Sequence, residues 1–367
     1  MAKTLELGAE MMTLRWDDGS ASQYPYIWLR DNCPSGFHPK TQERTADLLA
    51  LPTNPRPKRA QIEGGDAVVD WEGEAHVSRF GLEWLRGHAP GQGAPDAAGI
   101  APVLWRGSPE GGIARHGADA ILTNDAALRA WLEDLAAHGI AIVDGVGAAP
   151  EASVALAERI GFLRKTNFGT TFEVINRPDP NNLAYTAERL PLHTDLPNQE
   201  VPPGFQFLHC IANEAEGGGS LFADGFAMAE DLRTEAPDAF ERLSSIEIPF
   251  RFHDAETDLR VKRPVITCDL AGNVIEIRFN AHIAGVFDMP PGAVGGYYLA
   301  YRAYMERTRD ARYILNTRLQ AGEMVCFDNR RILHGRDAFD PSTGFRHLHG
   351  CYVDRGEFLA RLRLLSC

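Results

Sequence analysis

The sequence has few of the features that mark secreted or membrane-bound proteins. Its six cysteines are scattered over 367 residues, and no two of them form a Cys-x-x-Cys pair. Such thiols predict no disulfide framework and suit a reducing compartment. No segment approaches the roughly 20 apolar residues of a membrane-spanning helix, and the N-terminal segment lacks the apolar run of a signal peptide. We therefore expect a cytoplasmic protein without a membrane partner.

Positive charge is also scarce. The chain has 37 Lys and Arg residues against 50 Asp and Glu residues, which gives a formal net charge of −13 at pH 7. Because nucleic acids and anionic membranes bind basic surfaces, neither is an expected partner. An acidic protein is compatible with a small cationic substrate, although bulk charge says little about a pocket.

The composition that remains is that of a globular protein, with 44% hydrophobic and 24% charged residues. Residues 1–95 contain strand-like segments around turns such as Asp17-Asp18-Gly19, which predicts a small β-rich domain. Residues 96–112 are rich in Gly, Pro and Ala and predict a linker in which Trp105 packs against a neighbouring domain. Residues 113–367 form the expected main domain.

The main domain begins with two predicted helices. Thr123 or Asn124 caps the first helix, Gly139 ends it, and residues 150–161 form the second. Short strands follow, including a hairpin at residues 264–280. Helices followed by many short antiparallel strands predict an α+β fold built around a β-sandwich or jelly roll.

The most informative motif is the His-x-Asp pair formed by His193 and Asp195. In an extended segment both side chains leave the same face, and Thr194 points the other way. His334 is the predicted third ligand, with Gly335 leaving room beside the metal. Two imidazoles and one carboxylate on one face of Fe(II) leave the other positions open for a cosubstrate and oxygen. Among twelve histidines such a pair also arises by chance, so the surrounding sequence decides its meaning.

Two further polar residues extend this constellation. Arg346 lies twelve positions after His334 at the start of a strand-like segment. Its guanidinium can bind the distal carboxylate of a 2-oxoacid through two parallel hydrogen bonds. Ser220, which follows three glycines, is a second candidate donor to the same cosubstrate. A surface ion pair for the arginine and a turn for the serine are the ordinary alternatives.

The chain resembles the γ-butyrobetaine hydroxylases, within the taurine dioxygenase-like group of Fe(II)/2-oxoglutarate oxygenases. The matching segments are IGFLRKTNFG, DPNNLAYTAERLPLHTDLPNQEVPPGFQFLHCI, GGGSLFADGF, FDNRRILHGR, FRHLHGCY and the N-terminal YPYIWLRDNCPSGFHP. The resemblance covers nearly the whole chain. It implies a double-stranded β-helix, iron held by His193, Asp195 and His334, 2-oxoglutarate held by Arg346, O2 as the oxidant and a homodimeric assembly.

The resemblance also implies an aromatic cage for a trimethylammonium group. Such a cation is bound by the faces of aromatic rings, through cation–π attraction and desolvation of its methyl groups. The matching positions are Phe168, Phe172, Tyr185 and Tyr352. Two of them are Phe where the family usually has Tyr and Trp, which leaves the identity of the substrate open. Any single Phe is more often a core residue.

The other end of a betaine is an anion, which asparagine amides hold in the family. Asn182 and Asn280 match those positions, and Asn198 is an additional polar candidate close to the iron ligands. Arg278 and His282 have no assigned role. Either can serve a doubly charged anion such as a phosphonate, or can be an ordinary solvated strand residue.

A zinc site in the N-terminal domain is the last implied feature. The family holds Zn(II) there with three cysteines and one histidine. In this chain Cys33 and His76 match, but the other two positions are Ser35 and His38. Cys33, His38 and His76 leave a tetrahedral site one ligand short. Three outcomes stay open, namely zinc at this reduced site, a fourth ligand from elsewhere, or a domain that folds on its own core.

We therefore expect an Fe(II)/2-oxoglutarate-dependent hydroxylase of a small zwitterionic trimethylammonium substrate. γ-Butyrobetaine, which gives L-carnitine, is the first expectation. The same chemistry on 2-(trimethylammonio)ethylphosphonate or trimethyllysine is the alternative. A non-catalytic protein that binds quaternary amines is the alternative from another class, although intact iron ligands argue against it.

Overall fold

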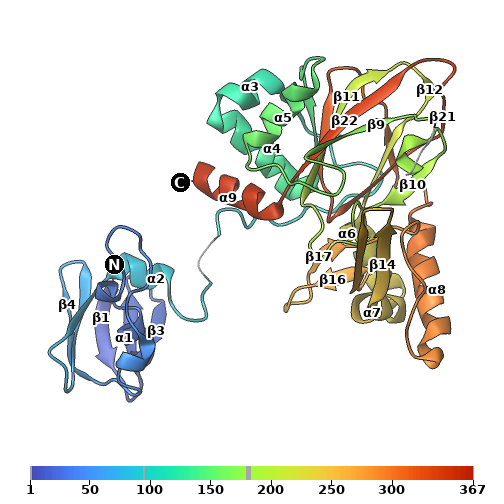
Figure 1. Ribbon diagram of the computed structural model, residues 1–367. Helices are drawn as coiled ribbons and strands as arrows, with labels where there is room; N and C mark the ends of the chain where they lie inside the picture. The colour runs from blue at the N-terminus through green and yellow to red at the C-terminus, as the bar shows by residue number, and fades with distance from the viewer. Residues whose placement is uncertain (1, 94–95, 179–182, 367) are drawn as a thin grey trace. The chain divides into compact units, whose positions relative to one another are not determined.

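The computed structural model describes residues 2–93, 96–178 and 183–366, and divides the chain into two compact units (Figure 1). The first unit spans Met1–Asp96 and the second Ala97–Cys367. Among the described residues, helices that combine the length and the apolar character needed to cross a bilayer are absent.

The first unit contains two three-stranded antiparallel sheets and two short helices. Its elements are β1 (Ala2–Leu7), β2 (Met11–Trp16), β3 (Ala21–Pro25), α1 (Tyr26–Asp31), β4 (Pro57–Glu63), β5 (Asp66–Trp71), β6 (Val77–Gly81) and α2 (Leu82–Gly87), with 3-10 turns at Pro34–Gly36 and Leu48–Ala50. Two tryptophans are buried with their indole N–H groups satisfied. Trp16 donates to Ser22 Oγ, and Trp71 donates to Ser78 Oγ, both at 2.9 Å. The unit therefore has a core of its own.

The second unit is built on two antiparallel sheets that face each other. The larger sheet has the order β7 (Arg115–Gly117), β8 (Ile140–Asp144), β19 (Met324–Asp328), β11 (Phe205–Asn213), β22 (Arg346–Val353) and β9 (Thr171–Ile175), and only its β7–β8 pair is parallel. The smaller sheet has the order β10 (Leu190–His193), β20 (Ile332–Arg336), β13 (Ser220–Asp224) and β18 (Leu315–Thr317). Phe222 and Ile332 of the smaller sheet share one buried cluster with Leu208 and Phe327 of the larger sheet, so apolar side chains fill the space between them.

Helices cover the outer face of the larger sheet. They are α3 (Ala118–Thr123), α4 (Asp125–His138), α5 (Pro150–Glu158) and α9 (Arg355–Leu365). Asn124, one of the two predicted caps, accepts a hydrogen bond from the Ala126 N–H, and Gly139 ends α4 with a φ of 76°. That left-handed conformation is the one that glycine adopts most easily at a helix end.

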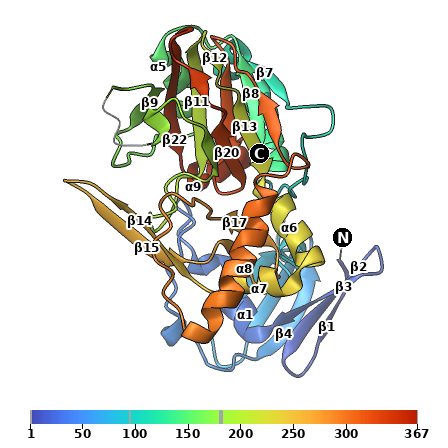
Figure 2. The same cartoon turned by 90° about the vertical axis from the view of Figure 1, so that its right-hand side faces the viewer.

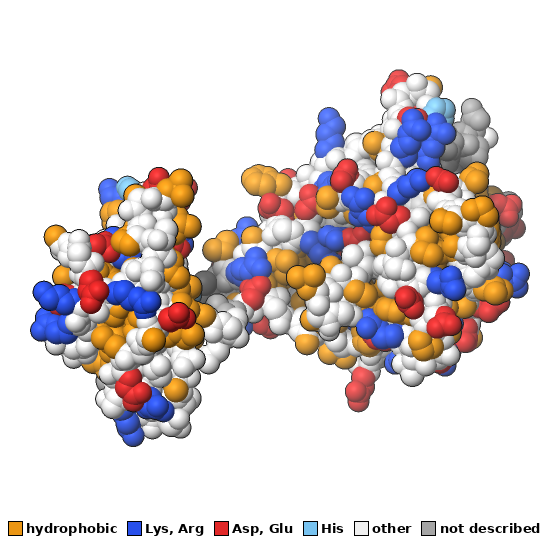
Figure 3. Space-filling view, turned by 90° about the horizontal axis from the view of Figure 1, so that it is seen from below, with side chains coloured by type: hydrophobic (Ala, Val, Ile, Leu, Met, Phe, Trp, Pro, Cys, Tyr) orange, Lys and Arg blue, Asp and Glu red, His pale blue; other side chains and the backbone are white. Residues whose placement is uncertain are grey.

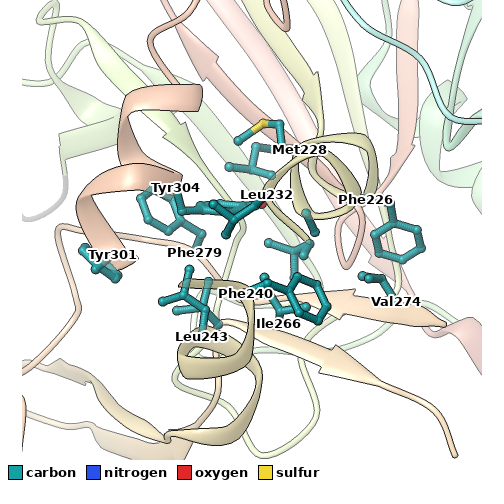
Figure 4. Packing of buried hydrophobic residues seen from close by; sticks show 14 of the residues in the cluster. Phe226, Met228, Leu232, Phe240, Leu243, Ile266, Val274, Phe279, Tyr301 and Tyr304 are labelled. Atoms are coloured by element: carbon teal, nitrogen blue, oxygen red, sulfur yellow. The ribbon is translucent and has the colours of Figure 1, made fainter. Parts of the chain in front are cut away.

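An insertion between β13 and β18 packs against the outer face of the smaller sheet. It lies below the strands of both sheets in Figure 2. It comprises α6 (Gly225–Glu235), α7 (Pro237–Ser245), β14 (Ile248–His253), β15 (Asp258–Arg263), β16 (Ile266–Cys268), β17 (Val274–Ile277) and α8 (Pro291–Arg307). Leu232 of α6, Leu243 of α7 and Tyr304 of α8 point into one apolar core, which Figure 4 shows. Leu192 and Leu333 join that core from the smaller sheet. Because side chains alternate along a strand, their neighbours His193 and His334 face the other sheet.

The segment predicted as a linker belongs largely to the second unit and is anchored there by Trp105, although most of its residues are exposed. Residues from Ala97 onward belong to the second unit. Trp105 is buried, its main-chain N–H donates to Asp224 Oδ2 at 3.2 Å, and its indole N–H donates to the His138 carbonyl at 2.8 Å. The Arg331 guanidinium joins this contact through Asp224 and the Val103 carbonyl, both within 2.8 Å.

Candidate metal centre and substrate pocket

A cavity of about 520 Å³ opens between the two sheets of the second unit. Strands of both sheets line it, and the hairpin strand β14 contributes Arg251, Phe252 and His253 at its rim. The predicted site residues that line it are Phe168, Phe172, Tyr185, His193, Asp195, Asn198, Ser220, Asn280, His334, Arg346 and Tyr352. Asn182, the remaining pocket candidate, lies outside the described residues.

The three predicted metal ligands converge in this cavity. His193 and His334 are paired across β10 and β20, with ring centroids 4.3 Å apart. Asp195 follows two residues after His193, and its Oδ1 lies 3.3 Å from His193 Nε2, while its Oδ2 lies 3.7 Å from His334 Nε2. One ligand atom from each residue lies within 4.8 Å of the others. Strand register therefore brings together side chains that are about 140 positions apart in the sequence.

The protonation states favour binding of a divalent cation. Burial lowers the pKa of His334 to about 3, and the neighbouring His193 ring adds to this effect. Burial opposes ionisation of Asp195, but His334, His193 and the Tyr352 hydroxyl outweigh it and hold the pKa of the carboxyl well below its usual range. A neutral imidazole and an ionised carboxylate are the forms that bind a metal ion.

Local contacts fix the orientation of the ligands. Nδ1 of His193 lies 2.9 Å from the Pro191 carbonyl and donates to it, which leaves Nε2 directed at Asp195. Thr194 points away from the cavity, as expected, and its Oγ1 accepts from the Phe279 N–H at 3.1 Å. Gly335 lines the cavity beside His334. A Cβ atom there would lie 2.5 Å from the Leu190 carbonyl oxygen, so glycine also permits the close approach of β10.

Arg346 forms a buried cationic site in the same cavity. It is the first residue of β22, is 4% exposed, and its Nε has no hydrogen-bond partner among the described residues. Burial, and then the nearby Arg336, lowers its pKa to about 10, so the guanidinium stays charged at neutral pH. A buried charge without a partner is costly, so this guanidinium is suited to pairing with an anion. Ser220 lies on β13 in the same cavity, directly opposite Arg336 of β20.

Arg336 is a pocket residue that the sequence did not single out. Its Nη2 donates to the carbonyls of Thr186 and Glu188, both at 2.7 Å. It therefore fixes the segment that leads into β10. The only signal in the sequence is its position two residues after His334.

The four aromatic candidates all line the cavity. Phe172 stacks on Tyr352 with ring centroids 5.0 Å apart, and Phe168 meets Phe252 edge-on at 5.4 Å. The Arg177 guanidinium lies 4.2 Å from the Tyr185 ring centre. Tyr352 also makes a contact that was not anticipated, because its hydroxyl donates to Asp195 Oδ2 at 2.7 Å. Phe252 was not predicted either, since it comes from the insertion.

The amide candidates differ in how far the protein satisfies them. Asn198 is 1% exposed, and neither amide atom has a partner among the described residues. Asn280 donates weakly to the Thr194 carbonyl at 3.4 Å and accepts from the His282 N–H at 3.1 Å. Gln206 on β11, which was not predicted, is 2% exposed and has an unpaired Oε1 facing the cavity. Asn198 and Gln206 thus have free hydrogen-bonding capacity for a ligand.

Arg278 is neither in the cavity nor solvated. It is buried, forms an ion pair with Glu276, and donates to the carbonyls of Pro197, Gln199 and Glu200 at 2.9–3.2 Å. The idea that Arg278 binds a phosphonate is therefore wrong, because its guanidinium is already used to hold the segment after Asp195. His282 does line the cavity, and burial lowers its pKa.

Of the three predicted zinc ligands of the first unit, Cys33 and His76 lie together but His38 does not join them. Cys33 Sγ lies 3.2 Å from both His76 Nε2 and Ser35 Oγ. His38 instead accepts a hydrogen bond from the Thr41 N–H through Nδ1 at 3.2 Å. In the part of the chain that the structure describes, the only group of three metal-type ligands is the one at Asp195. Two protein ligands do not fit a structural zinc ion, which takes four.

Comparison with known proteins places the chain among oxygenases. Residues 113–352 match the family model "Taurine catabolism dioxygenase TauD, TfdA family", and residues 4–86 match "Gamma-butyrobetaine hydroxylase-like, N-terminal". The chain is 41% identical to the gamma-butyrobetaine dioxygenase of Pseudomonas sp. (strain AK-1), over 98% of this chain and 94% of the relative. It is 32% identical to the Homo sapiens gamma-butyrobetaine dioxygenase, over 98% and 95%. It is 30% identical to the Gallus gallus mitochondrial trimethyllysine dioxygenase, over 98% and 87%.

A solved structure shares the fold. It is an asparagine oxygenase in complex with Fe(II), 2S,3S-3-hydroxyasparagine and succinate, with a TM-score of 0.51 and 16% identity, over 70% of this chain and 88% of that one. At that identity the likeness concerns the fold alone. The family match and the full-length relatives show that this chain is a dioxygenase of the TauD/TfdA family of Fe/2-oxoglutarate-dependent oxygenases.

Proposed function

We propose that this protein is an Fe(II)- and 2-oxoglutarate-dependent hydroxylase that converts γ-butyrobetaine to L-carnitine. The observation that supports it most is the convergence of His193, Asp195 and His334 in a cavity that also contains aromatic rings and a buried arginine. Two relatives named gamma-butyrobetaine dioxygenase, one of them 41% identical, favour this substrate over others.

In this proposal the two facing sheets form a double-stranded β-helix. Successive strands alternate between the sheets, since β10 and β20 belong to the smaller sheet and β11 and β19 to the larger one. Within each sheet the paired strands are antiparallel and distant in sequence, as β10 with β20 and β11 with β19. The iron ligands then project from the smaller sheet into the space between the layers. All three line the cavity, so a metal ion that they held would be accessible to ligands bound there.

Each end of 2-oxoglutarate has a suitable partner in the cavity. His193, Asp195 and His334 would hold Fe(II), whose three remaining positions accept the keto acid and O2 and supply the oxidising chemistry. Arg346 would bind the far carboxylate as a bidentate fork, with the Ser220 hydroxyl as an additional donor. Its buried, charged and incompletely paired guanidinium supports this role.

The substrate would lie with its cation against the aromatic rings and its carboxylate on amides. Phe168, Phe172, Tyr185 and Tyr352 supply ring faces, and burial in the cavity removes water from the methyl groups. Asn198 and Asn280 would hold the carboxylate, the first with both amide atoms free. Holding both ends fixes which carbon lies nearest the metal.

Trimethyllysine is the second candidate substrate. The 30% identity with a trimethyllysine dioxygenase over almost the whole chain supports it. 2-(Trimethylammonio)ethylphosphonate would need a dianion site, for which His282 is in place but Arg278 is not. A protein that only binds quaternary amines has no need of three converging metal ligands.

The test is 2-oxoglutarate turnover by the purified protein with each of the three amines, with succinate and the hydroxylated amine both measured. We expect γ-butyrobetaine to give the highest kcat/KM and one product per succinate. The matched control is Asp195→Ala, which should give neither. Stoichiometric binding of an amine without succinate formation in the iron-loaded protein would contradict the proposal and favour the binding protein.

We further propose a cytoplasmic homodimer without nucleic-acid or membrane partners. The net charge of −13 supports the absence of nucleic-acid and membrane partners, and on the face drawn in Figure 3 basic side chains are interspersed with acidic ones. The homodimer rests on the family resemblance alone. Light scattering after gel filtration would give the assembly size. A zinc ion in the first unit would need ligands beyond Cys33 and His76, and metal analysis of the purified chain would detect it.

A further inference from the structure

Asp195 is held differently from the two histidines. His193 ends β10 and His334 lies inside β20, so strand pairing fixes both, whereas Asp195 lies beyond the end of its strand. The next residue, Leu196, has a φ of 53°, a left-handed conformation that is uncommon outside glycine. Contacts from elsewhere in the fold must therefore stabilise the main chain at this ligand.

Asn329 supplies such contacts. It is fully buried in the turn between β19 and β20, five residues before His334. Its Oδ1 accepts from the Asp195 N–H at 2.7 Å, and its Nδ2 donates to the carbonyls of Asp195 at 3.0 Å and Pro203 at 3.2 Å. One side chain thus binds both polar groups of the Asp195 main chain and joins them to the segment that leads to His334.

Tyr352 acts on the carboxylate of the same residue. It comes from β22 on the opposite sheet, and its hydroxyl donates to Asp195 Oδ2 at 2.7 Å. Oδ1 lies 3.3 Å from Nε2 of His193. The hydroxyl therefore restricts rotation of the carboxylate and uses a lone pair of Oδ2. Its ring remains available to the cavity, stacked on Phe172.

We propose that Asn329 and Tyr352 are positioning residues that preset Asp195 for the metal, Asn329 through its main chain and Tyr352 through its carboxylate. The inference rests on the proposed function only in taking Asp195 as a metal ligand. It assigns Tyr352 a role in metal binding that is separate from contact with the substrate. Groups that orient ligands typically change metal affinity by roughly 10–100-fold when removed.

Tyr352→Phe tests the carboxylate half, because it removes the hydroxyl and keeps the ring. Fe(II) and Co(II) would be titrated anaerobically into the metal-free protein without amine or 2-oxoglutarate. We expect the metal dissociation constant to rise roughly tenfold and the visible spectrum of the Co(II) form to change. Tyr185→Phe is the matched control, since Tyr185 lines the same cavity next to Arg177, and it should bind both metals as the parent does.

Asn329→Asp tests the main-chain half with almost no change in size. The new carboxylate can no longer donate to the Asp195 and Pro203 carbonyls, so we expect metal affinity to fall by roughly tenfold or more. If this variant does not fold, as judged by circular dichroism, Asn329→Ser replaces it. For that variant the readout is the rise in Tm on adding Co(II), which should be smaller than in the parent.

The outcomes separate this inference from the proposed function. A parent protein that binds no metal would remove the proposed function itself. Tight binding by the parent, loss in Asp195→Ala and unchanged affinity and spectrum in Tyr352→Phe would refute the role of the hydroxyl alone. A parent-like affinity in folded Asn329→Asp, or a parent-like rise in Tm in Asn329→Ser, would refute the role of Asn329.

Discussion

His193 and His334 meet because neighbouring strands place them opposite each other, whereas Cys33 and His76 meet within a chain of hydrogen bonds. Asp195 joins the two histidines as a third ligand-type residue, and all three line a cavity. At the second place the Ser35 hydroxyl lies against the thiol. Among the described residues, only the first place thus combines three ligand-type side chains with an adjoining cavity.

The contact between Cys33 and His76 extends by hydrogen bonds to the core of the first unit. Trp71 donates to Ser78 Oγ at 2.9 Å, and Ser78 Oγ lies 3.2 Å from His76 Nε2, which in turn lies 3.2 Å from Cys33 Sγ. This chain of contacts gives His76 Nε2 and the Cys33 thiol partners without an ion. Packing around the two buried tryptophans then stabilises the unit.

The largest difference in metal affinity should be seen between a variant of the metal centre, Asp195→Ala, and a variant of the first unit, Cys33→Ala. Asp195→Ala removes a direct ligand, so we expect metal affinity to fall by more than the roughly 100-fold that orienting groups can produce, and turnover to stop. Cys33→Ala should leave Fe(II) affinity unchanged and lower the stability of the first unit. Anaerobic metal titration and thermal unfolding of both variants check this. Substantial turnover by Asp195→Ala would exclude the three-ligand site.

The buried arginine of the cavity should show the next largest effect. Arg346→Gln removes a charge that is proposed to pair with a carboxylate, and losing one partner of such a pair costs about 2–5 kcal/mol. We therefore expect the dissociation constant for 2-oxoglutarate to rise by roughly 30-fold or more, with Fe(II) affinity close to that of the parent.

Arg346→Lys is the matched variant, because it keeps the charge and loses the bidentate geometry. Its affinity for 2-oxoglutarate should fall between those of the parent and the glutamine variant. Binding measured by calorimetry on the Co(II) form would show the order. Equal affinity in all three proteins would place the cosubstrate carboxylate elsewhere.

The parts of this site that the sequence could predict are those with short-range signals. The period of two places His193 and Asp195 together, and Asn124 and Gly139 mark the ends of α4 through capping preferences that depend on a few neighbours. The hairpin predicted at residues 264–280 appears as β16 and β17 for the same reason.

The parts that the sequence could not predict depend on the register between distant segments. Asn329 reaches Asp195 across 134 positions, and the Tyr352 hydroxyl does so across 157. Arg278 was instead considered as a pocket residue and is not one. It lies two residues from Asn280, yet its side chain contacts the segment after Asp195 rather than the cavity. Spacing along the chain carries no information about such contacts.

The pH dependence of stability in the metal-free protein should also differ between the His193–Asp195–His334 site and the Cys33–His76 pair. We expect this effect to be smaller than those above. The pKa of His334 is about 3 in the folded protein, against an ordinary value of 6.5. Between these values the unfolded chain takes up a proton that the native site does not, so stability falls as the pH falls. From pH 6.5 to pH 5 this amounts to about 2 kcal/mol. The contribution of His334 fades to nothing about one pH unit above 6.5.

Urea unfolding at several pH values, with a chelator present, would measure this dependence. His334→Gln lacks the titrating group, so the free energy of unfolding of the second unit should depend less on pH than in the parent. Burial also lowers the pKa of His76. His76 is only half-buried whereas His334 is buried, so we expect the first unit to lose less stability over the same range. An identical pH dependence in parent and variant would contradict this account of His334.

The smallest change in stability is expected for His38→Ala. This variant tests most directly whether the first unit binds a metal ion. If His38 shared an ion with Cys33 and His76, His38→Ala would lower stability as much as Cys33→Ala and release a metal ion. Because His38 instead accepts from the Thr41 N–H, we expect a change in unfolding free energy within about 0.5 kcal/mol, as for other surface substitutions. Stoichiometric zinc in the parent and its loss in His38→Ala would overturn the contrast between the two places, since it would show that the hydrogen-bonded cluster rearranges to take an ion.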